Sequence, residues 1–94
     1  MHIAERREGD HQIYAAATET PVGGFFAGCV VMRRAPAPLT PLEVFRDERL
    51  EDGRVWVDPA QALAFAIQVG AAAVHAQAWF AGARAMEFED SHFA

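Results

Sequence analysis

The most regular hydrophobic pattern in the chain runs from Leu63 to about Phe80 and predicts a helix. Its start is well specified, because Asp58 is a favoured capping residue, Pro59 suits the first helical position and Gln61 stands at the reciprocal position of a capping box. At about 100° per residue, one face of this helix is apolar. The residues on that face are Leu63, Ile67, Gly70, Val74 and Ala78.

A second apolar strip lies more than a quarter-turn away on the same helix. We predict that it forms an interface, and its residues are Phe65, Val69, Ala73, Ala76, Trp79 and Phe80. A helix that is apolar over most of its circumference must be buried on more than one side. Because a sheet covers only one side, we expect a second copy of the protein to cover the other.

The same helix meets one criterion for a membrane span. Ala62 to Ala83 contains no charged residue and is long enough to cross a bilayer. Alanine adds little insertion energy, however, Gln68, His75 and Gln77 interrupt the segment, and no basic cluster flanks it. We therefore expect its small residues to pack closely on a sheet, and we expect no contact with a membrane.

Strand patterns precede the helix. They cover residues 1–7, 11–19, 25–34, 42–50 and, more briefly, 55–57. The segment 25–34 is apolar on both faces, which predicts a central strand that is covered on both sides. Charges on both faces at the far end of 42–50 suit an edge strand.

Turn residues separate these strands. Gly9 and Gly23-Gly24 mark the first two turns, and Asp52-Gly53 is a favoured hairpin pair. Three prolines make residues 35–41 a stiff connector with polyproline character. An alternative function for this stretch is a proline-rich ligand motif, Pro38-x-x-Pro41.

We predict an α+β fold: one domain, residues 1–94, with an antiparallel meander of three to five strands and one long helix packed on one face. Residues 1–9 and 85–94 are expected at its periphery or to be mobile.

Composition narrows the function classes. The 94 residues carry a net charge of −5, and all eight basic residues are arginine. An acidic chain repels phosphate backbones, so we expect no nucleic-acid partner. A single cysteine, Cys29, allows no intramolecular disulfide, and no hydrophobic signal region follows Met1. We expect a cytoplasmic protein, and the abundance of alanine and arginine without lysine suggests a high-GC bacterial gene.

No motif predicts chemistry. The four histidines, His2, His11, His75 and His92, show no metal-ligand spacing, and Glu48, Glu51 and Asp52 match no calcium loop. Cys29 lies in an apolar strand without a local base, so a buried structural cysteine is expected. Asp10 and His11 are neighbours on a strand pattern and are better explained as turn residues. We therefore predict no catalytic residue, no metal site and no cofactor.

The junction from Trp56 to Pro59 and the strand patterns together resemble those of a known class of proteins. The chain resembles a class of small bacterial proteins of unknown function with an antiparallel β-meander followed by one long helix. The matching features are a strand like Phe25–Arg34, a strand like Val44–Leu50, and a tryptophan leading into an alanine-rich helix with a glycine at Gly70. The resemblance covers roughly residues 10–80. It implies the fold and no activity, so no functional residues carry over.

Three function hypotheses follow. The leading one is a non-catalytic protein-interaction module that forms a homodimer, through the second apolar strip or through an apolar face of the sheet. The alternative is a ligand-binding or enzymatic module with a pocket between helix and sheet, and acid–base work from His75 or His11. The third is an RNA-binding domain, which the layout loosely resembles. A helix that begins Asp58-Pro59 with no basic residue until Arg84 speaks against it.

Overall fold

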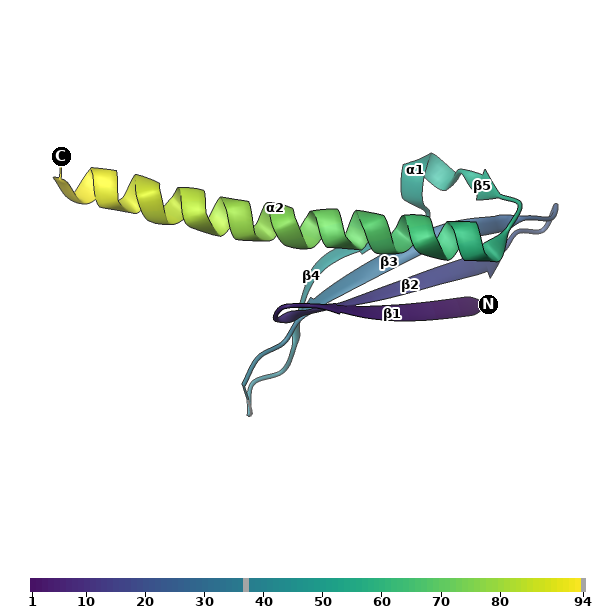
Figure 1. The fold of residues 1–94 in the computed structure, drawn as a ribbon, viewed down its shortest axis with the longest axis horizontal. Helices are drawn as coiled ribbons and strands as arrows, with labels where there is room; N and C mark the ends of the chain where they lie inside the picture. Colours follow the sequence, from purple (N-terminus) through teal and green to yellow (C-terminus); the bar gives the residue numbers. More distant parts are fainter. Residues whose placement is uncertain (37, 94) are drawn as a thin grey trace.

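The fold is an open antiparallel sheet with one long helix across one face (Figure 1). The computed structural model describes the backbone of residues 1–36 and 38–93 and the side chains of residues 1–36 and 38–76. The elements are β1 (His2–Glu8), β2 (His11–Glu19), β3 (Phe25–Arg33), β4 (Leu42–Asp47), α1 (Leu50–Gly53), β5 (Val55–Trp56) and α2 (Pro59–Phe93). The strand order β1-β2-β3-β4 is a meander, which confirms the predicted α+β class.

Alternate side chains of β2 and β3 face α2 and form the core. The side chains that face α2 are small or branched and are buried: Ile13, Ala15 and Ala17 from β2, and Ala27, Cys29 and Val31 from β3. β3 is central, as its apolar pattern predicts. The expectation that both of its faces are covered is wrong for the single chain, because α2 lies on one face only (Figure 1).

β4 ends earlier than the sequence pattern predicts. The strand stops at Asp47 rather than Leu50, and Leu50 instead opens α1 with only 3% of its surface exposed. A β-bulge also breaks the predicted alternation, because Phe45 pairs with Val31 and Glu43 with the next residue of β3. Val44 is the extra residue, and both Val44 and Phe45 pack against the core.

The predicted hairpin at Asp52-Gly53 does not join β4 to β5. Glu51 and Asp52 take left-handed backbone angles, with φ of 52° and 55°, and the chain turns through α1. β5 then pairs with the start of β3, where Trp56 lies opposite Phe25. β4 and β5 therefore form one interrupted edge alongside β3.

Asp58 caps α2 as predicted, since its Oδ1 accepts a hydrogen bond of 2.8 Å from the amide of Ala60. The contact face differs from the predicted one. The residues of α2 that are fully buried against the sheet are Ala62, Ala66 and Gly70. The larger apolar residues of the predicted face stand to one side of this line and are only partly buried. Small side chains form the contact because they let the helix approach the sheet closely.

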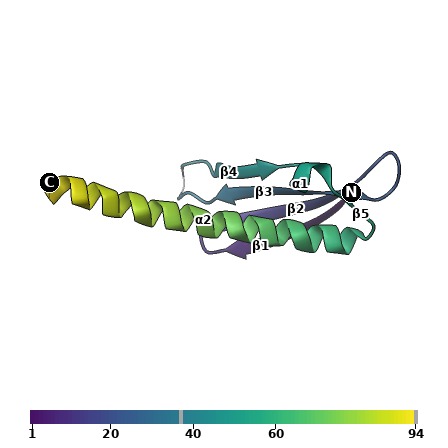
Figure 2. The ribbon, with the colours of Figure 1, turned by 90° about the horizontal axis from the view of Figure 1, so that it is seen from above.

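α2 is longer than the sheet it covers. Thirty-five helical residues extend about 52 Å at 1.5 Å per residue, whereas a nine-residue strand extends about 30 Å. The C-terminal part of α2 therefore runs beyond the sheet (Figures 1 and 2). Ala78, which we predicted on the contact face, lies outside the residues whose side chains are described.

Candidate functional site

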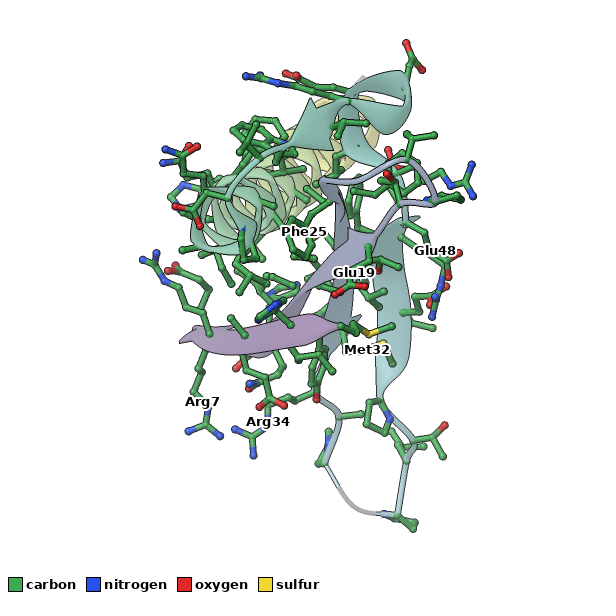
Figure 3. All side chains as sticks on the ribbon, turned by 90° about the vertical axis from the view of Figure 1, so that its right-hand side faces the viewer. Arg7, Glu19, Phe25, Met32, Arg34 and Glu48 are labelled. Atoms are coloured by element: carbon green, nitrogen blue, oxygen red, sulfur yellow. The ribbon has the colours of Figure 1, made fainter. Side chains whose placement is uncertain are left out.

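The face of the sheet opposite α2 is an apolar surface that the described elements leave open. Figure 3 shows Phe25 on the helix side of the sheet, whereas Arg7 points away from α2. Ile3 is 65% exposed on this open face and Tyr14 is 38% exposed. The side chains of Val30 and Met32 on β3 are partly exposed there. An apolar face of this kind is typical of an interaction surface.

The strand register arranges the open face in rows across the sheet. In the first row, Glu5 pairs with Tyr14, Tyr14 with Val30, and Val30 with Arg46. Each row is therefore a line of four side chains, one from each strand. This first row has a negative charge at the β1 edge, a positive charge at the β4 edge and two large apolar side chains between them.

A neighbouring row has the opposite polarity. Arg7 pairs with Gln12, Gln12 with Met32, and Met32 with Glu43. The positive charge now lies at the β1 edge and the negative charge at the β4 edge. We call these the Glu5–Arg46 row and the Arg7–Glu43 row.

Small residues hollow the centre of the open face. Ile3 pairs with Ala16, and Ala16 with Gly28, so the next row has two small members. A side chain at Gly28 would meet the carbonyl oxygen of Glu48 at 3.0 Å, which explains why glycine fits there. The resulting hollow measures about 790 Å³ and is open to solvent along its length.

Charged side chains border the hollow at its β4 edge. Arg46 forms ion pairs with Glu43 at 2.7 Å and with Glu48 at 2.9 Å. The hydrogen bond and charge of Glu43, followed by those of Glu48, raise the pKa of the Arg46 guanidinium above its ordinary value. Arg49 places its guanidinium carbon 4.7 Å from the ring centre of Phe26. This edge of the hollow is thus lined by paired charged side chains.

The strip predicted as an interface is partly covered by the protein itself. Phe65, Val69 and Ala73 are half-buried and pack against the core. The ring of Phe65 lies 5.0 Å from that of Trp56, so β5 covers this end of the strip. Ala76 is exposed. The other two strip residues, Trp79 and Phe80, lie outside the residues whose side chains are described.

The structure brings together two histidines that are far apart in the sequence. His11 and His75 line a hollow of about 330 Å³ beside the β1–β2 turn, together with Glu8 and Asp10. His11 Nε2 is buried without a hydrogen-bond partner in the part of the chain whose side chains are described, whereas His75 is exposed. Among residues 1–36 and 38–76, no group of histidine, cysteine and acidic side chains has the arrangement of a metal site.

Cys29 is a buried structural residue, as predicted. Only 2% of its surface is exposed. Burial, and to a smaller degree the charge of Asp47, raises the pKa of its thiol to about 11. A thiol with this pKa stays protonated near neutral pH and is a poor nucleophile.

The apolar start of α2 packs on the sheet of the domain. The segment Pro59–Ala76 has a mean hydropathy of 1.2, sufficient by length and composition for a membrane span. The core helix of a soluble domain meets the same criterion, and this segment packs along the sheet through Ala62, Ala66 and Gly70. The cytoplasmic location and the absence of membrane contact stay predictions.

Comparisons with protein-family models, with curated proteins and with solved structures give no match. The resemblance to small bacterial proteins with a meander and a long helix therefore stays a prediction.

Proposed function

We propose that the protein is a non-catalytic self-association module whose interface is the open face of the sheet. The observation that carries the proposal is β3, a central strand whose Val30 and Met32 lie on a face that α2 does not cover. Central strands that are apolar on both faces are normally covered on both sides. A second copy of the chain supplies the missing layer and gives a sandwich of two sheets.

The size of the face limits how large an interface two copies can form. Four strands about 4.8 Å apart and about seven residues long give a projected area of about 450 Å² per copy. Two copies then bury about 900 Å², close to the lower limit of about 1,000 Å² for specific interfaces. We therefore expect a dissociation constant in the micromolar range.

Mutations on the face test this proposal. Val30→Glu and Ile3→Glu place a charge on the open face, and both should convert the protein to a monomer of 10.3 kDa in sedimentation velocity. Val57→Glu is the matched control, because Val57 is 90% exposed at the start of α2 and away from the face. Circular dichroism checks that each variant is folded.

The predicted helix strip provides a second comparison. Ala76→Glu places a charge on the exposed part of that strip and should leave the dimer intact. A dimer that is lost with Ala76→Glu and kept with Val30→Glu would contradict the proposal and assign the interface to the helix. A parent protein that is monomeric at every concentration would contradict self-association itself.

A small-ligand site is the second candidate, because the hollow of about 790 Å³ lies within the size range of ligand pockets. It lies on the open face rather than between helix and sheet, where the alternative hypothesis placed it. At its β4 edge the charged side chains of Arg46 and Glu48 pair with each other, and Arg46 also pairs with Glu43. A dimer structure in which side chains of the second copy fill the hollow would exclude this candidate.

A further inference from the structure

The two charged rows of the open face have a symmetry that a second copy can use. The Glu5–Arg46 row runs from negative at β1 to positive at β4, and the Arg7–Glu43 row runs from positive to negative. We propose that two copies pack face to face about a two-fold axis parallel to the strands. This proposal rests on the self-association proposed above. Glu5 then lies opposite Arg46 of the partner subunit, and Arg7 opposite Glu43 of the partner subunit.

This axis follows from simple geometry. A two-fold axis parallel to the strands, midway between β2 and β3, exchanges β1 with β4 and β2 with β3. This axis leaves the position of each row along the strands unchanged. Every row therefore faces the same row of the partner subunit, with the order of the four strands reversed. Tyr14 then faces Val30 of the partner subunit, at the spacing of about 10 Å and the crossing of about 30° that packed sheets adopt.

The other in-plane axis, across the strands, gives a poorer match. Centred on the Glu5–Arg46 row, it sets Glu5 against Glu5 of the partner subunit, and like charges directly opposite are destabilising. It becomes complementary only when it passes between the two charged rows. That position lies towards one end of the face and leaves the exposed Ile3 at the other end without cover.

Arg46 has the hydrogen-bonding capacity that the pairing needs. Its bonds to Glu43 and Glu48 use Nε and Nη1. A guanidinium carries five N–H donors, so Nη2 can donate to a further carboxylate. Glu5 lines the same hollow as Arg46, and its Oε2 accepts a long hydrogen bond of 3.4 Å from Gln12 on the same face. Both side chains thus belong to the surface that a second copy would cover.

Mixing singly mutated chains tests the axis. Glu5→Arg alone and Arg46→Glu alone should each weaken the dimer by about tenfold, because each sets like charges opposite one another at two symmetric sites. An equimolar mixture of the two variants should recover association to within about threefold of the parent. Energy transfer between differently labelled chains measures the mixed dimer directly.

Two further mixtures make the outcome decisive. A mixture of Arg7→Glu and Glu43→Arg should recover association in the same way. This mixture replaces the first one as the test of the axis if Arg46→Glu disturbs β4. Glu5→Arg mixed with Arg7→Glu should not recover, and recovery there would overturn the proposal in favour of the axis across the strands. If Val30→Glu abolishes the dimer but none of the charge variants changes its affinity, the face is the interface and the proposed axis is wrong. A monomeric parent would overturn both proposals.

Discussion

Gly70 of α2 lies so close to Ile13 of β2 that a side chain at position 70 has no room. A Cβ at this position would overlap Ile13 Cγ2 and would stand 2.9 Å from Cys29 Sγ. Ile13 and Cys29 are themselves almost fully buried at the centre of the core. The separation of helix and sheet is therefore set by the absence of one methyl group.

This contact predicts the effect of Gly70→Ala. Alanine favours helix by about 1 kcal/mol over glycine, but overpacking a core costs about 1–3 kcal/mol, so we expect a net loss of stability. Urea unfolding measures it, and Ala64→Gly on the exposed side of α2 calibrates the propensity alone. In an Ile13→Ala background, Gly70→Ala should cost less. A Gly70→Ala variant more stable than the parent would show that the helix does not pack this closely.

The cap at Asp58 predicts a smaller effect. Asp58→Ala removes the acceptor for the Ala60 amide and should lower the free energy of unfolding by about 1 kcal/mol. Asp58→Asn keeps an equally good capping group and should stay within a few tenths of a kcal/mol of the parent. Equal losses in both variants would mean that the charge of Asp58, rather than its capping bond, stabilises the start of α2.

Phe65 should matter for the fold of a single chain. It packs on Trp56, whose ring centre also lies 4.0 Å from the guanidinium carbon of Arg54. Phe65→Ala should therefore lower stability by about 1–3 kcal/mol, less than for a fully buried phenylalanine. In a Trp79→Phe background, where Trp56 is the remaining tryptophan, its emission should shift to the red. Unchanged emission and stability would contradict this packing.

The raised pKa of Cys29 predicts a loss of stability at alkaline pH. The native thiol holds its proton up to about pH 11, whereas the ordinary value is 9.0. The contribution is fully present below pH 9 and is lost as the pH rises through 11, by about 2–3 kcal/mol. Urea unfolding between pH 8 and 11 should show a steeper decline for the parent than for Cys29→Ala. Parallel curves would show that the thiol titrates normally in the folded protein.

The strand pattern and the helix start could be read from the sequence because local physics determines them. The Gly9 and Gly23-Gly24 turns fix where β1, β2 and β3 begin and end, and Asp58-Pro59 fixes the start of α2. The loose alternation in β2 also indicates which of its side chains are buried. These elements need no knowledge of distant contacts.

The β4–α1–β5 edge could not be predicted from its local pattern. Hydrophobic alternation predicts neither the left-handed conformations at Glu51 and Asp52 nor the bulge at Val44, which lies where β4 pairs with β3. The contact face of α2 also differs from the predicted face. Hydrophobicity favours Leu63 and Ile67, whereas close packing on the sheet favours the small residues beside them.

The candidate interface was predictable only in part. The sequence shows that β3 is apolar on both faces, which already indicates a second covering layer. The row that joins Glu5 to Arg46 requires the register of four strands, and the bulge in β4 shifts that register by one residue. The sequence alone therefore could not align these charges.

If a second copy covers the open face of the sheet, the molar mass of the parent protein in solution must depend on its concentration. Light scattering from about 5 to about 500 µM spans the expected range of dissociation constants. We expect a mass that rises from 10.3 kDa towards twice that value across this range. A mass that stays at 10.3 kDa at every concentration would contradict it.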